Sequence, residues 1–311
     1  MFKQFLKKLP IINLWHKNVR LNYDLSFSEQ QLNNAIEKVA ETHLRYLHLL
    51  KMQGDNVFES NNIIISLTSY NLRVELVHHT ILSLLCQTVR PQKLILWLSE
   101  TEFSLETLPD SLIELQQFGL EIAFCRDIRS YKKLIPTLKK YPDSTIITFD
   151  DDVIYPVDHV EKMVSTAANY PNMVICHLAH SITFSPIKRT NAGKEIISYN
   201  KWPKGVEHSL PCDTLFPVGV GGVLYPAKCL DNDVLNEEKF TTLCPYADDI
   251  WFKLMALKKG TLTKLVDQPK PFKDYLHLPN TQKLSLWKIN IEKNDKQLAA
   301  VLAAYPEIKF D

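Results

Sequence analysis

Residues 145–155 read TIITFDDDVIY, an apolar, β-branched run that ends in three consecutive carboxylates. The run Thr145–Phe149 is typical of a buried strand. Asp150, Asp151 and Asp152 follow it directly, and like charges this close to a core repel one another. Because side chains alternate along a strand, Asp150 and Asp152 are expected to point the same way. That spacing suits a divalent cation, Mg2+ or Mn2+, held together with substrate phosphates. The alternative is a solvated acidic turn after a strand.

The composition is that of an ordinary globular protein. The chain has 311 residues, 45% of them hydrophobic, which allows one large domain or two small ones. Its formal net charge is +1, so no global field attracts nucleic acid and we expect no nucleic-acid partner. Its six cysteines include no CxxC pair and no cluster with zinc-ligand spacing. With no secretory signal pattern, we expect reduced thiols and a cytoplasmic location. No apolar run is long enough to span a bilayer.

The first 60 residues differ from the rest and are expected to form a helical extension. Basic and apolar side chains are interleaved over residues 1–20, which favours a peripheral contact with the inner face of the inner membrane. The alternative is a short helix packed on the body and broken at Pro10. Residues 27–52 follow as an amphipathic helix, with Ser26 and Glu29 in the positions of a capping box.

From residue 62 onward, strands and helices alternate. Strands are predicted at 63–67, 93–98, 120–125, 145–149 and 173–178, with helices between them at 74–85, 105–118, 130–140 and 157–169. This order predicts an α/β fold with a mostly parallel central sheet, helices on both faces and ligands at the carboxyl ends of the strands. Further on, the sequence predicts a long loop at 183–217, a strand at 219–225, a helix at 247–259, a strand at 261–267 and a helix at 284–303 interrupted near 290–294.

Two polar segments follow predicted strands. After the first strand, Ser69 and Arg73 belong to the run SLTSYNLR, whose hydroxyls and guanidinium suit a nucleotide base and phosphate. Ordinary helix capping is the alternative. After the third strand, Asp127 suits a base or ribose, while Ser130 and Lys133 suit a diphosphate. Here the alternative is a solvated basic helix start.

Two further features are candidates for catalysis. Asp248 and Asp249 open the helix at 247–259, and an ionised carboxylate there can deprotonate a sugar hydroxyl. The alternative is helix capping. His277 is a lone imidazole. Because two carboxylates leave a metal under-coordinated, His277 is a candidate third ligand, with a structural histidine as the alternative.

Six motifs in order resemble those of bacterial GT-A glycosyltransferases, and more narrowly the family 2-like enzymes encoded with surface-polysaccharide (capsule or lipopolysaccharide) genes. The motifs are IISLTSY at 64–70, SLLCQT at 83–88, LILWL at 94–98, YKKLIP at 131–136, DDDVIYP at 150–156 and ADDIW at 247–251. The resemblance covers residues 62–280. It implies a GT-A fold, a nucleotide-sugar donor and a divalent metal, Mn2+ or Mg2+.

The resemblance also implies roles for individual residues. The metal would be held by Asp150, Asp152 and His277, and the inverting base would be Asp249 or Asp248. The donor would be contacted by Thr68, Ser69, Tyr70, Arg73, Asp127, Ser130, Lys133, Asp150 and Asp151. One departure stands out: the chain has Arg129 followed by Ser130 where a Gly-Pro-like turn is expected in relatives.

We therefore expect a metal-dependent, inverting glycosyltransferase that moves a sugar, from a UDP-sugar by default, to a hydroxyl of a glycan or lipid-linked acceptor. Acceptor contacts are expected from Trp202, His208, Gly221, Gly222 and Trp251. The expected division is an extension at 1–60, a catalytic domain at 61–280 and a helical segment at 281–311. The alternatives are a sugar-phosphate transferase and an inactive nucleotide-sugar or glycan-binding module. A dinucleotide-binding dehydrogenase is disfavoured because no GxGxxG follows the first strand.

Overall fold

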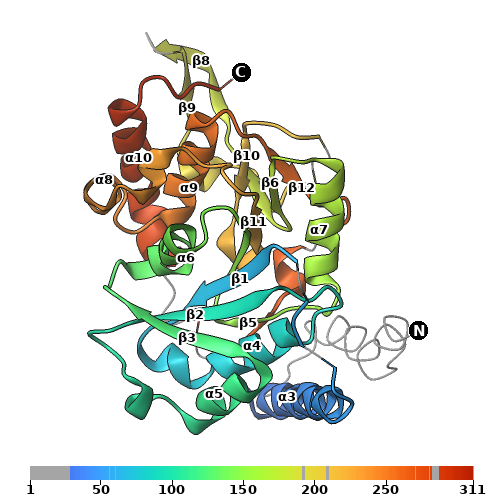
Figure 1. Ribbon diagram of the computed structural model, residues 1–311. Helices are drawn as coiled ribbons and strands as arrows, with labels where there is room; N and C mark the ends of the chain where they lie inside the picture. Colours follow the sequence, from blue (N-terminus) through green and yellow to red (C-terminus); the bar gives the residue numbers. More distant parts are fainter. Residues whose placement is uncertain are drawn as a thin grey trace.

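A seven-stranded sheet forms the centre of the protein in a computed structural model that describes residues 29–55, 57–59, 61–190, 193–207, 210–269, 271–279, 281 and 287–310 (Figure 1). Its strand order is β12-β6-β11-β4-β1-β2-β3. The strands are β1 (Ile63–Thr68), β2 (Lys93–Ser99), β3 (Leu120–Cys125), β4 (Thr145–Phe149), β6 (Val174–Cys176), β11 (Val223–Tyr225) and β12 (Thr263–Leu265). β11 is antiparallel to β4 and β6, and the other pairings in this sheet are parallel. The predicted mostly parallel sheet is confirmed.

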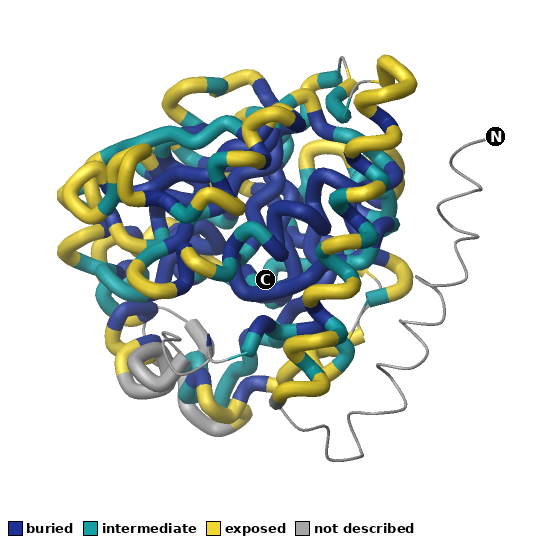
Figure 2. Tube along the Cα trace, turned by 90° about the horizontal axis from the view of Figure 1, so that it is seen from below, coloured by how far each residue is buried: buried dark blue, intermediate teal, exposed yellow. Residues whose placement is uncertain are grey.

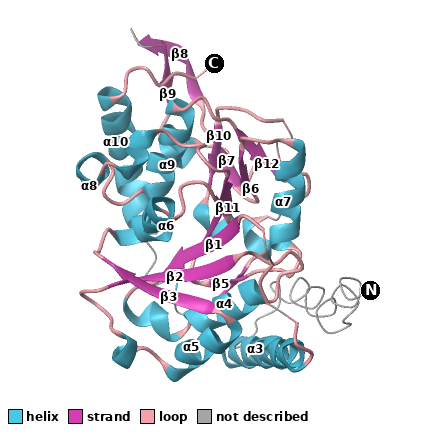
Figure 3. Ribbon diagram, viewed as in Figure 1, coloured by secondary structure: helices cyan, strands magenta, loops and turns pink. Residues whose placement is uncertain are grey.

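Helices cover both faces of this sheet (Figure 3), as the predicted fold class requires. They are α3 (Glu29–Met52), α4 (Val77–Leu85), α5 (Asp110–Ile113), α6 (Ile135–Lys140), α7 (His159–Asn169), α8 (Glu237–Leu243), α9 (Asp248–Lys258) and α10 (Trp287–Ala304). One core lies among α6, α8, α9 and α10, and the other among α3, α4, α5 and α7. The α/β fold class is therefore confirmed.

Alternation along the strands builds the two cores. Ile146 belongs to the core under α9, whereas its neighbour Ile147 belongs to the core under α4. Both are fully buried, because successive side chains in a strand point to opposite faces of the sheet. Burying each of them contributes about 1.5–3 kcal/mol. Figure 2 shows the burial of each residue along the chain: buried residues lie at the centre and exposed residues in the outer turns.

Three pairs of short strands lie outside the main sheet. β5 (Val153–Ile154) pairs with β13 (Leu276–His277), β7 (Ala179–Ser181) with β10 (Leu215–Pro217), and β8 (Phe184–Thr190) with β9 (Gly193–Ile196), all antiparallel. The prediction of a long loop at 183–217 was therefore wrong. β8 and β9 pair as neighbours in the chain, whereas the β5–β13 and β7–β10 pairs join segments far apart in the chain, for which strand-to-helix spacing gave no signal.

Several predicted helices are shorter than expected. The helix at 105–118 is divided into a 3₁₀ turn η2 (Leu105–Thr107), α5 and a 3₁₀ turn η3 (Glu114–Phe118), with Pro109 at the break. The helix at 130–140 is divided into η4 (Arg129–Lys133) and α6, where Pro136 lies in the first turn and needs no N–H partner. The helix at 74–85 likewise begins as η1 (Asn71–Glu75). In contrast, α10 is continuous, so the predicted interruption near 290–294 was wrong.

The two ends of the described chain pack on the body. α3 places Leu47 and Leu50 in the core under α4, and α10 places Leu298 and Val301 in the core under α9. Among the described residues, no helix has the length and apolar character needed to cross a bilayer. The predicted membrane contact of residues 1–20 and the cap at Ser26 lie outside the described residues, and the predicted domain division remains a prediction.

Candidate active site

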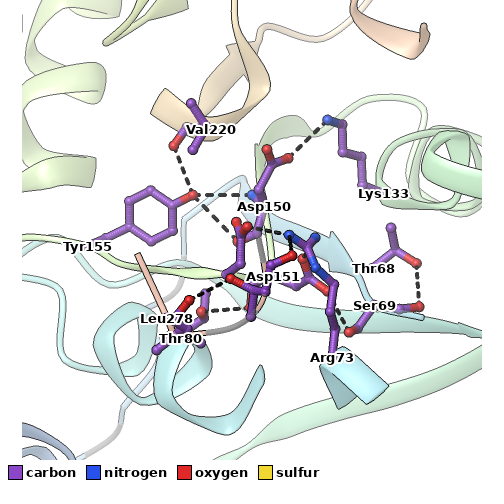
Figure 4. A network of polar contacts seen from close by, with 12 residues as sticks. Thr68, Ser69, Arg73, Thr80, Lys133, Asp150, Asp151, Tyr155, Val220 and Leu278 are labelled. Atoms are coloured by element: carbon purple, nitrogen blue, oxygen red, sulfur yellow. Dashed lines mark hydrogen bonds and ion pairs between the residues drawn. The ribbon is translucent and has the colours of Figure 1, made fainter. Parts of the chain in front are cut away.

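The polar motifs of the sequence meet at one edge of the sheet. β1, β2, β3 and β4 are parallel, so their carboxyl ends lie at the same edge. The SLTSYNLR segment leaves β1, the segment beginning at Arg126 leaves β3, and the aspartate triplet leaves β4. Figure 4 shows the side chains from these three segments converging in one network.

The first part of this network is the Arg73 cluster, which we define as Ser69, Arg73, Asp151 and Asp152. Arg73 donates from Nη1 to Asp151 at 2.6 Å and from Nη2 to Asp152, and Ser69 Oγ donates to Asp151 at 2.6 Å. Asp151 and Asp152 are each 4% exposed. Burial raises the pKa of Asp151 to about 7, although Arg73 lowers it. The predicted donor-binding groups Ser69, Arg73 and Asp151 thus satisfy one another.

The second part is the Lys133 cluster, which we define as Lys133, Asp150, Asp248 and Asp249. Lys133 Nζ lies 3.2 Å from Asp150 Oδ1, 2.9 Å from Asp248 Oδ2 and 3.6 Å from Asp249 Oδ1. Burial of Lys133 opposes its charge, yet the three carboxylates hold its pKa well above the ordinary value. One ammonium therefore joins the triplet after β4 to the two carboxylates that open α9.

Gly219, which the sequence analysis did not select, lies against the Lys133 cluster. Its N–H donates to Asp249 Oδ2 at 3.1 Å. A Cβ at this position would lie 2.6 Å from Lys133 Nζ and 3.1 Å from both Asp150 Oδ1 and Asp249 Oδ1. The cluster therefore requires glycine here. The only signal in the sequence was the glycine-rich entry to the strand predicted at 219–225.

Of the two carboxylates that open α9, Asp249 is the better placed to meet a substrate. Its side chain is 26% exposed, whereas that of Asp248 is 10% exposed. Burial raises the pKa of Asp249 to about 7, Lys133 lowers it, and Asp248 and Asp150 raise it further. A group with a pKa near 7 exchanges a proton readily at neutral pH, which is the property of an efficient general base.

The predicted metal ligands come close together through strand pairing. In the β5–β13 pair, His277 lies opposite Val153, directly after the triplet, and Leu278 N donates to Asp152 O at 2.8 Å. Burial lowers the pKa of His277, although Asp152 and Asp150 raise it. This favours the neutral imidazole, the form that binds metals. A third metal ligand would need to lie beside the triplet, and His277 does.

The donor set fits a hard divalent cation in part. The two clusters contain five carboxylates against the two cations Arg73 and Lys133, and carboxylate oxygens are the ligands Mg2+ and Mn2+ prefer. However, Asp150 is paired with Lys133 and Asp152 with Arg73. Within the described ranges, no three His, Cys, Asp or Glu side chains already form a metal site. An open site, in which substrate oxygens complete the coordination left by the protein ligands, therefore fits better than a site closed by protein side chains alone.

The other predicted donor contacts lie around these clusters. Thr68 Oγ1 donates to the Trp97 carbonyl at 2.8 Å at the end of β2. The Tyr70 ring lies 5.4 Å from the guanidinium of Arg73. Asp127 forms an ion pair with Lys132. Ser130 Oγ is buried and has no hydrogen-bond partner among the described residues.

The predicted acceptor contacts occupy different places. Trp202 and Trp251 are 2% and 0% exposed, and their indole N–H groups donate to the carbonyls of Ile197 and Val234. Neither ring is presented to a ligand, because both lie in the core between α9 and the neighbouring strands.

Gly221 and Gly222, which were also predicted to contact the acceptor, are tightly packed as well. A Cβ at Gly221 would lie 2.7 Å from Leu178 Cβ, and one at Gly222 would lie 2.5 Å from the Phe149 ring. Close packing of the backbone therefore explains both glycines. His208 lies outside the described residues. A cavity of about 370 Å³ does open nearby, between η4 and the segment that leads into α9.

No protein-family model and no curated protein matches the sequence. Similar solved structures include TarS of S. aureus, with 12% identity and a TM-score of 0.44 over 78% of this chain and 71% of that one. The mannosyltransferase PcManGT from Pyrobaculum calidifontis, in complex with GDP-Man and Mn2+, has 12% identity and a TM-score of 0.40 over 78% of this chain and 66% of that one. The inositol-1-phosphate CTP transferase from T. maritima has 12% identity and a TM-score of 0.42 over 77% of this chain and 97% of that one. At TM-scores below 0.5, these likenesses decide nothing about the substrate, metal or reaction of this chain.

Proposed function

We propose that this protein is a glycosyltransferase that uses a nucleotide-sugar donor at the carboxyl edge of the sheet. The observation that carries the proposal is the Lys133 cluster, in which one buried ammonium brings Asp150 together with Asp248 and Asp249. Acidic groups after a parallel strand suit a nucleotide diphosphate with its cation, and a partly exposed carboxylate beside them suits deprotonation of a hydroxyl.

The chain's own residues divide the work. Asp249 accepts the proton of the acceptor hydroxyl as that hydroxyl attacks the sugar. Gly219 and Lys133 hold the Asp249 carboxylate in place through the contacts described above. The Arg73 cluster constrains Asp150 indirectly, because it fixes the neighbouring Asp151 and Asp152. Lys133 and Ser130 would contact the donor diphosphate.

A divalent metal, Mn2+ or Mg2+, completes the proposal. Asp150 and Asp152 would hold it, with His277 as the candidate third ligand, and when bound it would neutralise the negative charge of the leaving diphosphate. The inverting outcome, a UDP-sugar donor and an acceptor in capsule or lipopolysaccharide synthesis are the finer parts of the proposal. They rest on the resemblance of the six sequence motifs to GT-A enzymes.

A donor panel tests the proposal. The full chain is incubated with UDP-, GDP-, dTDP- and CMP-sugars in Mn2+ or Mg2+, with EDTA as the metal-free control, and the released nucleotide is identified. Release of a nucleoside diphosphate from one donor, lost in EDTA, is the expected result. Release of a nucleoside monophosphate from a diphosphate-linked donor would instead identify a sugar-phosphate transferase. Donor binding without release, in wild type and Asp249→Asn alike, would indicate a binding module or an acceptor missing from the reaction.

A further inference from the structure

The cavity of about 370 Å³ has two walls. Arg129 and Asp127 line it from the segment after β3, and Thr241, Pro245 and Tyr246 line it from the segment before α9. Its volume lies near the lower end of the range of about 300–1,000 Å³ that is typical of small-molecule sites. It therefore has room for one sugar-sized group with a substituent, rather than for a whole nucleotide sugar.

Positive charge gathers around the ring of Tyr246, a residue of the second wall. The Arg129 guanidinium lies 4.3 Å from the centroid of the Tyr246 ring, and Lys293 Nζ lies 4.2 Å from the same centroid. Within the part of the chain that the structure describes, neither cation forms an ion pair with a carboxylate. The one acid on the cavity wall, Asp127, is itself paired with Lys132. Two cations beside one aromatic ring, neither of them in an ion pair among the described residues, favour an anionic ligand.

The guanidinium of Arg129 is held in position by the backbone conformation of this residue and by its neighbours. Arg129 has a φ of +57°, a left-handed conformation that usually favours glycine or asparagine. Its N–H donates to Asp127 Oδ1 at 3.0 Å, and its Nη1 donates to the Pro245 carbonyl at 3.0 Å. A constrained arginine with further donors left for a ligand therefore stands at the turn where GT-A relatives are expected to have a Gly-Pro-like sequence.

Both walls continue directly into the Lys133 cluster. Tyr246 precedes Asp248 by two residues, and the wall residue Tyr131 precedes Lys133 by two. The charges of Asp248 and Asp249 act on the Tyr131 hydroxyl, in accord with this proximity. The cavity therefore lies beside the segments that carry Lys133 and Asp249, although neither of these residues lines it.

We propose that this cavity binds a phosphate or carboxylate group of the acceptor and so brings the acceptor hydroxyl to Asp249. This inference rests on the proposed function and names the acceptor class: an anionic glycan or lipid-linked sugar, rather than a neutral one. Arg129, which lines the cavity, contacts the anion, and Lys293, on the same Tyr246 ring, adds positive charge.

Binding of defined probes to the full chain tests the inference without requiring turnover. The probes are the methyl glycoside of glucuronic acid and glucose 1-phosphate as anions, methyl glucoside as the neutral match, and UDP for the donor side. Each is titrated against wild type, Arg129→Asn, which tolerates the left-handed backbone, and Arg126→Asn. The last is the matched control, because Arg126 lies on the same segment but pairs with Glu237 and does not line the cavity.

The expected result is that at least one anionic probe binds wild type more tightly than methyl glucoside does. Arg129→Asn weakens that binding about tenfold, the loss of one charge-assisted hydrogen bond. It changes UDP binding less than twofold, and Arg126→Asn has little effect on any probe. Thermal unfolding confirms that each variant is folded, and Lys293→Gln, an exposed change, gives a second test of the same loss.

Three outcomes would overturn the inference: no preference for the anionic probes, equal binding to wild type and Arg129→Asn, or a loss confined to UDP, which would assign the cavity to the donor. These outcomes are distinct from failure of the proposed function. That function fails when no nucleotide sugar is turned over, whatever the probes do.

Discussion

The Arg73 cluster and the Lys133 cluster share the aspartate triplet, yet they hold their charges differently. Arg73 binds two carboxylates that are each 4% exposed, and Ser69 adds a further bond to one of them. Lys133 contacts three carboxylates, of which the Asp150 and Asp249 side chains keep 32% and 26% of their surface exposed. Consecutive aspartates can therefore lie in different surroundings: the Arg73 cluster is closed, whereas the Lys133 cluster is open and leaves two carboxylates partly exposed.

The largest effect is expected from the open cluster. Asp249→Asn removes the proton acceptor and should lower kcat by about 10²–10⁴-fold, the usual contribution of a general base. The melting temperature and the donor KM should change little, because the side chain keeps its shape and its N–H partner Gly219. Steady-state kinetics with the donor found in the panel measures this. Asp248→Asn is the comparison, and an equal or larger loss there would transfer the role of base to Asp248.

A substitution in the closed Arg73 cluster should lower the stability of the protein. Arg73→Met leaves Asp151 and Asp152 buried without their cation, which typically costs about 3–5 kcal/mol of the free energy of unfolding. Urea unfolding followed by circular dichroism measures the loss. Arg126→Met is the matched control, since Arg126 is 80% exposed on its side chain, and a surface change of this kind should alter stability by about 0.5 kcal/mol or less. Similar small losses in both variants would contradict the structural role of the Arg73 cluster.

Gly219→Ala tests the Lys133 cluster by changing the backbone position that packs against it. The added methyl group would meet Lys133 Nζ at 2.6 Å, and because that nitrogen ends a flexible side chain, Lys133 can move away while the fold survives. Displacement of the cluster should lower kcat about 10²-fold, the cost of misplacing a catalytic group by about 1 Å. The melting temperature should stay close to that of wild type. Unchanged kcat would show that the Lys133 contacts do not position Asp249.

The smallest effect is expected in the pH dependence. Burial raises the pKa of Asp249 to about 7, and this carboxyl must lose its proton before it can act as a base. The value of kcat/KM should therefore rise with pH and level off above about 7, falling about tenfold for each unit below the pKa. A pH profile of wild type measures this rise. A rate that is flat between pH 5 and 8 would remove Asp249 as the ionising base.

The sequence alone predicted the regular parts of the molecule. β3 and β4 have the predicted bounds 120–125 and 145–149, because a short, mostly apolar run bounded by polar or turn-forming residues specifies a strand locally. The break at Pro109 was not predicted: one helix was expected over 105–118, and the structure divides that helix there. Likewise, β13 has only two residues, too few for a periodic pattern, so its pairing beside the triplet could not be predicted.

The candidate site also divides into features that the sequence predicted and features that only the structure showed. The sequence determined that acidic groups follow a buried strand and open a helix, since both signals lie within a few consecutive residues. Only the tertiary structure decided that Lys133 joins those groups, that Arg73 takes Asp151 and Asp152, that Gly219 closes against them, and that Trp251 is buried. The physical reason is that strand and helix formation depend on local periodicity. The partner of a buried charge depends instead on which distant segments the sheet brings to the same edge.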